Sequence, residues 1–240
     1  RGESDISLLP VENSIEGTVG RTLDLLVTAK VKISAEISIP INHLLLRKVE
    51  GFNHITKVVA HSQALLQCQK WLDLRLPSVP RLAVESNGVA AQMAQQDEKI
   101  VAIAGKLAQE KYDLVSLAND IQNEKFNRTR FAALGKFEPD GCGTDQTSII
   151  VGVRDQVGAM HKVVESFAKN YVSLRRFESR PARTNRVHAW EYLFYIDLEG
   201  HINDTKVKKA LDDVKENSVF FKNLGSYPLF EKLGLPSRLT

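Results

Sequence analysis

The sequence lacks the residues and motifs on which several large classes of protein depend. It has only two cysteines, Cys68 and Cys142, too few for a disulfide scaffold or a cysteine-ligated zinc site. None of its six histidines forms an HxxxH or HExxH pair, and no GxGxxG, GxSxG or P-loop motif occurs. We therefore expect a protein with no metal and no nucleotide cofactor.

The sequence also lacks a strong excess of one charge and a long apolar run. Lys plus Arg is 32 against 29 for Asp plus Glu, and the surplus is spread along the chain, so we expect neither nucleic acid nor a membrane as partner. The densest basic stretch, residues 175–186, has five arginines and is typical of a solvated face or a small-anion site. Apolar runs fall short of the ~18–20 residues of a membrane helix, and the few cysteines fit a reducing compartment, so we expect a cytoplasmic protein.

What is present is enough for a packed core in one large domain or in two modest ones. Apolar residues make up 43% and charged residues 25% of the 240 residues. The best linker candidate is residues 135–145, GKFEPDGCGTD, with little apolar content and with Pro139, Gly141 and Gly143.

The part after this linker has a clear alternation of elements. The predicted order is β-α-β-β-α-β, the ferredoxin-like fold. Its predicted strands are residues 147–153, 171–177, 189–198 and 219–224, and its predicted helices are residues 158–170 and 203–217.

The part before the linker mixes strands and helices in an α/β manner. Its predicted strands are residues 6–9, 34–41, 58–60, 81–84 and the start of 100–112, and its predicted helices are residues 22–27, 62–72, 88–95 and the rest of 100–112. A chain that opens on a buried-type strand is unusual for a domain start, so we expect part of this domain to lie upstream of Arg1.

Polar residues gather where predicted strands lead into helices. Residues 10–20 (PVENSIEGTVG), 60–68 (AHSQALLQC) and 77–87 each follow a strand, a place where α/β folds bind ligands. Residues 127–131 (NRTRF) read as a loop with Thr129 between two arginines, which suits an anionic substrate. Taken alone, each segment is more typical of ordinary polar turns and helix caps than of a binding site.

Taken together, these segments resemble the prephenate dehydratase catalytic domain, followed by the regulatory ACT domain of that family. The matching stretches, in order, are LPVENSIEGTVGRTLDLL (9–26), AHSQALLQCQKWL (60–72), NRTRFAALG (127–135), VGAMHKVVESFAKNYVSLRRFESRP (157–181), WEYLFYIDLEGH (190–201) and NLGSYP (223–228).

The resemblance implies an α/β fold in which a periplasmic-binding-protein-like, two-lobed catalytic domain with an incomplete first lobe precedes a ferredoxin-like βαββαβ ACT domain. The implied boundaries are 1–136 for the catalytic domain, 137–146 for a linker, 147–228 for the ACT domain and 229–240 for a tail. The family's glycine-rich first segment has no counterpart here.

The implied reaction converts prephenate to phenylpyruvate, CO2 and water in phenylalanine biosynthesis, with no cofactor. By resemblance, Thr129 is the proton donor to the departing hydroxyl, Arg130 a carboxylate anchor and Phe131 a packing residue that fixes the loop. The implied substrate-binding positions are Asn13, Ser14, Gln67, Glu85 and Ser86. We expect Thr129, Asn13 and Gln67 to converge on one cleft between two lobes.

The implied effector is L-phenylalanine at the ACT domain, bound between residues 158–160 and residues 178–181. Those residues are Gly158, Ala159, Met160, Glu178, Ser179, Arg180 and Pro181. ACT domains commonly pair side by side, so we expect a homodimer or homotetramer. Two alternatives stay open: an arogenate dehydratase, and a catalytically inactive amino-acid-binding fragment.

Overall fold

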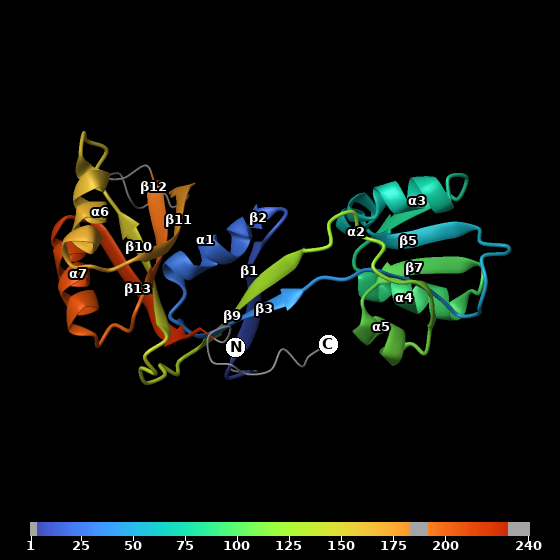
Figure 1. Cartoon of the computed structure of the whole chain (residues 1–240), viewed down its shortest axis with the longest axis horizontal. Coiled ribbons are helices and arrows are strands. Elements are labelled where there is room, and N and C mark those ends of the chain that lie inside the picture. Colours follow the sequence, from blue (N-terminus) through green and yellow to red (C-terminus); the bar gives the residue numbers. More distant parts are fainter. Residues whose placement is uncertain (1–3, 183–191, 230–240) are drawn as a thin grey trace. The chain divides into compact units, whose positions relative to one another are not determined.

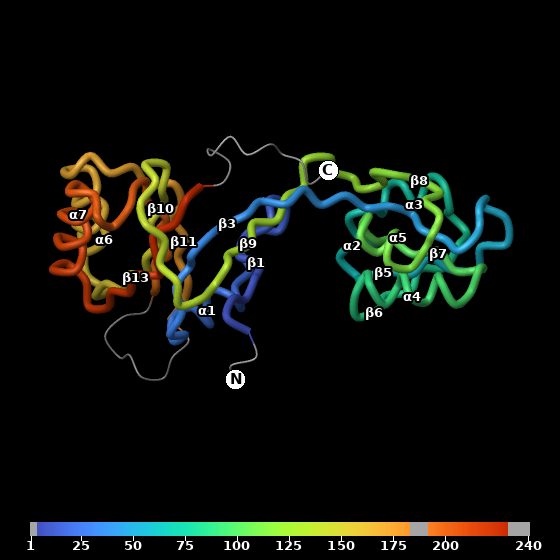
Figure 2. Tube along the Cα trace, turned by 90° about the horizontal axis from the view of Figure 1, so that it is seen from below, coloured from blue at the N-terminus to red at the C-terminus, as the bar shows by residue number. Residues whose placement is uncertain are grey.

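The computed structural model describes residues 4–182 and 192–229 and divides the chain into two compact units. The first unit comprises Arg1–Ile39 with Thr129–Thr240, and the second comprises Pro40–Arg128 (Figure 1). The chain leaves the first unit at the end of one strand and returns at the start of another (Figure 2). Of the expected tail, 229–240, only Leu229 is described, and residues 189–191 of the predicted third ACT strand lie outside the described residues.

One sheet of the first unit joins the beginning of the chain to its middle. Its order is β2-β1-β9-β3, and β1 and β9 are antiparallel. The strands are β1 (Ser7–Asn13), β2 (Gly17–Thr18), β3 (Lys32–Pro40) and β9 (Arg128–Gly135). The expectation that residues 127–131 form a loop is therefore wrong for residues 128–131, because β9 pairs with β1 from Leu134 opposite Ser7 to Thr129 opposite Asn13.

Helix α1 (Gly20–Thr28) follows β2 and places Leu23 and Leu26 in the core. Its last turn leaves carbonyls that have no partner inside the helix. Lys222, from the last strand of the unit, donates to the carbonyl oxygens of Leu26, Val27 and Ala29 at 2.6, 3.1 and 2.6 Å. A cation at the carboxyl end of a helix also suits the helix dipole.

The second sheet of the first unit confirms the predicted ferredoxin-like fold. Its order is β11-β12-β10-β13, and every pair is antiparallel. Its elements are β10 (Asp145–Gly152), α6 (Ala159–Lys169), β11 (Leu174–Pro181), β12 (Tyr192–Glu199), α7 (Thr205–Glu216) and β13 (Phe220–Pro228). Helices α6 and α7 cover one face (Figure 1).

The other face of this ferredoxin-like sheet packs against α1 and the β1–β9 sheet. Ile150 and Tyr195 lie in one core with Leu23 and Ala132, while Ile149 packs toward the helices. Because β10 has an apolar layer on each side, all eight of its residues are buried.

The second unit is a five-stranded sheet of order β6-β5-β7-β4-β8 with helices on both faces. Its strands are β4 (Leu44–Arg47), β5 (Lys57–His61), β6 (Arg81–Val84), β7 (Ile100–Ala104) and β8 (Val115–Ala118), and its helices are α2 (Ser62–Gln67), α3 (Gln69–Arg75), α4 (Asn87–Gln96) and α5 (Lys106–Lys111). The predicted helix over 62–72 is two helices that meet at Cys68. Within residues 4–182 and 192–229, no helix is long and apolar enough to cross a membrane.

Candidate active site

The first unit brings Thr129 and Asn13 together, although 116 residues separate them. They are direct cross-strand partners on β9 and β1, and the Asn13 amide nitrogen donates to the Thr129 hydroxyl oxygen at 2.9 Å. Both residues are buried, at 9% exposure. Because its oxygen accepts from Asn13, the Thr129 hydroxyl is left to direct its own proton elsewhere.

The orientation of the Asn13 amide is fixed by the turn that follows it. Its side-chain oxygen accepts from the backbone N–H groups of Ile15 and Glu16 at 3.0 and 3.2 Å. With the oxygen engaged there, the NH2 group must face Thr129. A β-bulge at Val11 shifts the register by one residue, which sets Asn13 opposite Thr129.

Two further predicted residues lie on or beside this pair. Ser14 is exposed, in the turn directly after Asn13. Phe131 lies two residues beyond Thr129 and therefore on the same face of β9. The predicted role of Phe131 in fixing a loop does not hold, because residues 128–135 form a strand.

Arg130 lies on the opposite face of β9 from Thr129, since successive strand residues point to opposite sides. Its guanidinium pairs with Glu36 through Nε and Nη2, both at 2.7 Å, and with Glu12 through Nη1 at 2.6 Å. A fourth contact joins Nη2 to Asp197 at 3.3 Å. Burial lowers the pKa of Arg130, but the hydrogen bond and charge of Glu36 and the charge of Asp197 outweigh it, so the pKa lies above its ordinary value.

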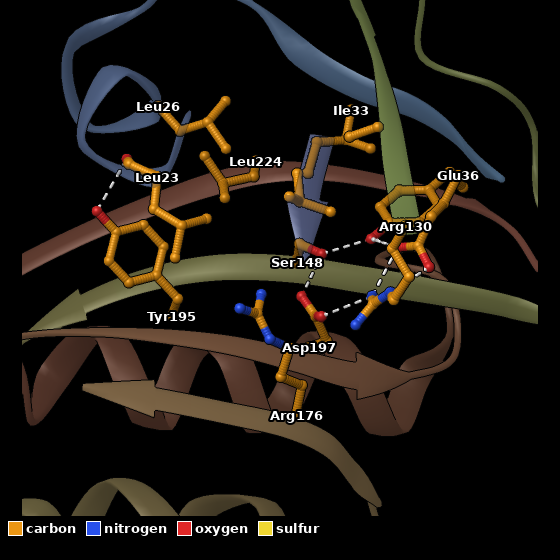
Figure 3. Close-up of a pocket in the computed structure, with 13 residues that line it drawn as sticks. Leu23, Leu26, Ile33, Glu36, Arg130, Ser148, Arg176, Tyr195, Asp197 and Leu224 are labelled. Atoms are coloured by element: carbon orange, nitrogen blue, oxygen red, sulfur yellow. Dashed lines mark hydrogen bonds and ion pairs between the residues drawn. The ribbon is translucent and has the colours of Figure 1, made fainter. Parts of the chain in front are cut away.

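The close-up of this region shows a pocket between the two sheets of the first unit (Figure 3). Charged groups gather at one end, around Arg130 and Asp197, and apolar side chains such as Leu23 and Leu224 line the other (Figure 3). The cavity has a volume of about 20 Å³. One water needs about 10–15 Å³, so this pocket is too small for an aromatic acid or an amino acid.

In the second unit, Gln67 ends α2 and is held by two other side chains. His43 approaches the Gln67 side-chain oxygen with Nε2 at 2.8 Å, and the Asn127 amide donates to the same oxygen at 3.4 Å. His43 is buried, and this burial lowers its pKa although the hydrogen bond to Gln67 opposes the shift. A neutral His43 that donates from Nε2 orients the Gln67 amide.

Glu85 and Ser86 lie between β6 and α4, and both are exposed. Ser86 is the N-cap of α4, and its hydroxyl accepts from the Val89 N–H at 3.1 Å. Asn87 beside it accepts from the His61 N–H at 2.9 Å, which ties the carboxyl ends of β5 and β6 together. The predicted substrate-binding role of Glu85 and Ser86 stays a prediction.

The predicted effector residues lie at one end of the ferredoxin-like sheet. Gly158, with φ of +80°, is the N-cap of α6, followed by buried Ala159 and half-buried Met160. Residues 178–181 belong to β11, whereas the sequence pattern predicted that this strand ends at residue 177. Neighbouring side chains of β11 have different surroundings. Ser179 is exposed, whereas Arg180 pairs with Asp24 of α1 at 3.2 Å.

The structure adds four residues that the sequence did not single out. His43 and Asn127 hold Gln67, and Glu36 and Asp197 hold Arg130. Two of the four lie in stretches that the sequence analysis quotes, since Asn127 begins NRTRF and Asp197 lies within WEYLFYIDLEGH (190–201).

Comparison with known proteins assigns both parts of the chain. The sequence profile of prephenate dehydratase matches residues 1–139, and that of the ACT domain matches residues 147–216. The bifunctional chorismate mutase/prephenate dehydratase of Aquifex aeolicus is 43% identical over 94% of this chain and 61% of its own length. Arogenate dehydratase 1 of Petunia hybrida is 34% identical over 98% of this chain and 59% of its own length. The chain thus spans about three fifths of these relatives.

A solved structure agrees with the sequence matches. The prephenate dehydratase of Arthrobacter aurescens, determined in complex with L-Phe, superposes with a TM-score of 0.85 at 32% identity, over 96% of this chain and 77% of that one. Together with the mixed α/β architecture and the ferredoxin-like second sheet, these matches show that the chain belongs to the prephenate dehydratase family and carries an ACT domain.

Proposed function

We propose that the protein containing this chain converts prephenate to phenylpyruvate, with Thr129 as the proton donor. The observation that carries the proposal is the buried hydrogen bond from Asn13 to the Thr129 hydroxyl oxygen, at 2.9 Å. Family membership supports the reaction class, and the bond supplies a hydroxyl whose proton is aimed by its surroundings.

The reaction needs little from the protein beyond orientation and one proton. The bond between the ring and its carboxylate breaks, and CO2 leaves. The electron pair of that bond enters the ring as the C4–O bond breaks, and the departing hydroxide takes up a proton to leave as water. Aromatisation of the ring drives the step, so positioning and charge stabilisation are the protein's contribution.

The Thr129 hydroxyl is a weak acid, and its role depends on where its proton points. Asn13 donates to the oxygen, which withdraws electron density from the O–H bond and leaves the proton for another acceptor. The Asn13 amide in turn is locked by the N–H groups of Ile15 and Glu16. This chain of contacts supports a fixed donor at the point where the C4 hydroxyl departs.

We further propose that L-phenylalanine binds the ACT domain and lowers this activity. The support is the position of residues 158–160 and 178–181 at one end of the ACT sheet, where Pro181 pairs with Tyr192, and Leu193 with Gly152. The Arthrobacter aurescens protein, which was determined with L-Phe, supports the same ligand. An effector acts only if it binds one conformation more tightly than the other.

The proposal includes a homodimer formed through the ACT domain. Strand β11 is at the edge of its sheet, and an edge strand offers unpaired backbone groups to another chain. Phe177 on β11 exposes 42% of its surface, which supports an apolar contact there. Light scattering after gel filtration tests this: a monomer at micromolar concentration contradicts it.

The test of the function is turnover by the full-length protein with prephenate and, separately, with arogenate. We expect phenylpyruvate from prephenate, suppressed by L-phenylalanine. A higher kcat/KM for arogenate would establish the alternative supported by the 34% identity to the Petunia hybrida enzyme. Binding of L-phenylalanine without turnover of either substrate would refute catalysis and leave an amino-acid-binding protein.

A further inference from the structure

Arg130 joins three strands at the position of Thr129. Strand β9 lies between β1 and β3 in the sheet. The Arg130 guanidinium reaches Glu12 on β1 at 2.6 Å and grips both carboxylate oxygens of Glu36 on β3 at 2.7 Å. A two-pronged arginine–carboxylate pair fixes direction as well as distance. Arg130, the residue next to Thr129, therefore fixes β9 to both of its neighbouring strands.

The ACT domain supplies the third carboxylate. Asp197 on β12 is 6% exposed and contacts Arg130 Nη2 at 3.3 Å. Its other oxygen accepts from the Ser148 hydroxyl at 2.6 Å, and Ser148 is 2.7 Å from the Tyr227 hydroxyl. Asp197 is thus fixed inside the ACT sheet while it holds an arginine of the catalytic sheet (Figure 3).

These contacts argue against the predicted role of Arg130 as an anchor for the substrate carboxylate. The guanidinium already lies among Glu12, Glu36 and Asp197, on the face of β9 opposite Thr129. Partly buried ion pairs of this kind add little net stability compared with apolar packing, because desolvation offsets much of the attraction. The main contribution of such a cluster is to fix the relative positions of the strands that carry its members.

We propose that Arg130 is a positioning residue for Thr129, and that Asp197 makes this positioning depend on the ACT domain. The inference rests on the proposed function, because it takes Thr129 as the proton donor. Glu12 strengthens the argument, since it precedes Asn13 directly and pairs with Arg130 across the strands. One guanidinium therefore sets both members of the Thr129–Asn13 pair through their chain neighbours.

The expected effect follows from how steeply catalysis depends on position. A displacement of about 1 Å in a reacting group can lower the rate about 100-fold. A small movement of β12 against β9 would shift Arg130, and with it the Thr129 hydroxyl, while the predicted substrate-binding residues Gln67, Glu85 and Ser86 belong to the other unit. The ACT domain then alters kcat more than KM.

The experiment compares Arg130→Lys, Asp197→Asn and a matched control, Asp212→Asn, in the full-length protein. Asp212 is also an ACT carboxylate in an ion pair, but its partner is the exposed Lys215 of the same helix. We expect Arg130→Lys to lower kcat about 10- to 100-fold, and Asp197→Asn to lower it about 3- to 10-fold, each with KM within twofold. Asp212→Asn leaves both constants unchanged.

The double variant of Arg130 and Asp197 separates positioning from general destabilisation. If Asp197 acts through Arg130, Arg130→Lys with Asp197→Asn lowers kcat no further than Arg130→Lys alone. Asp197→Asn should also reduce the fold-inhibition by L-phenylalanine at least twofold. Turnover is expressed per folded molecule. Thermal melting shows that each variant is folded, and the stoichiometry of L-phenylalanine binding gives the concentration of folded protein.

Three results overturn the inference. A raised KM with unchanged kcat in Arg130→Lys means that Arg130 binds substrate directly. Unchanged kcat and unchanged inhibition in Asp197→Asn mean that the ACT domain does not act through the contact of Asp197 with Arg130. Multiplying effects in the double variant mean two independent sites. If Thr129→Val is inactive while these results hold, the proposed function stands and only the inference fails.

Discussion

Replacement of Thr129 by valine tests the proposed proton donor most directly. Valine keeps the shape of threonine and its preference for a strand, so β9 should still pair with β1. What is lost is the hydroxyl, and with it the acceptor of the Asn13 N–H. The expected outcome is a folded protein that binds substrate and turns it over slowly.

The magnitude can be worked out for both properties. A positioned general acid contributes about 100- to 10,000-fold, which corresponds to about 2.7–5.4 kcal/mol in the activation barrier. Leaving the Asn13 amide without its acceptor should lower the free energy of unfolding by about 1–3 kcal/mol, because the pair is buried at 9% exposure. The two losses are therefore separable by a urea titration.

The assay is steady-state formation of phenylpyruvate from prephenate, with Thr129→Ser as the matched control. Serine keeps the hydroxyl and loses one methyl group, so kcat should stay within about tenfold of the parent. A valine variant that retains kcat within tenfold, while it stays folded, would refute the assignment of Thr129 as the acid.

Three further predictions concern residues outside that pair. Burial raises the pKa of the Cys68 thiol to about 12, so a thiol reagent at pH 8 should label exposed Cys142 rapidly and Cys68 only on unfolding; rapid labelling that survives Cys142→Ser would contradict this. Burial lowers the pKa of His43 below 6.5, so the folded state binds fewer protons than the unfolded state below that pH. The free energy of unfolding should therefore fall with decreasing pH below 6.5, by at most about 1.4 kcal/mol per pH unit relative to His43→Gln in parallel urea titrations; identical slopes would disprove the shift. Gly225 has φ of +132°, and an added Cβ would meet the Ile33 carbonyl, so Gly225→Ala should lower the free energy of unfolding by about 2 kcal/mol or more, whereas an unchanged melting temperature would count against this contact.

Local pattern predicted the ferredoxin-like half well. The apolar spacing of residues 158–170 and 203–217 leads to α6 and α7, and short β-branched runs lead to the strands around them. The prediction of strands failed where a segment becomes a strand only through its pairing with a distant strand. Strand β4 is four residues long without alternation, and residues 128–131 look like a polar loop until β1 is placed beside them.

The site was predicted by type of residue but not by arrangement. The motif resemblance singled out both Asn13 and Thr129, and the structure places them in direct contact. No local signal reveals that Arg130 faces away from Thr129 or that Asp197 meets it, because 67 residues separate Asp197 from Arg130. Long-range contacts of this kind follow from topology, which a single sequence does not display.

The capping of α1 by Lys222 has a consequence for how the chain is made. The helix is synthesised well before its cap, because the lysine that satisfies its last carbonyls lies 195 residues after Val27. At about 5–20 residues per second, the ribosome needs roughly 10–40 s to reach it. For most of that interval the core around Leu23 and Leu26 also lacks Leu193, Tyr195 and Leu224. The carboxyl end of α1 therefore gains its capping cation, and its core is completed by Leu224, only once β13 has been synthesised.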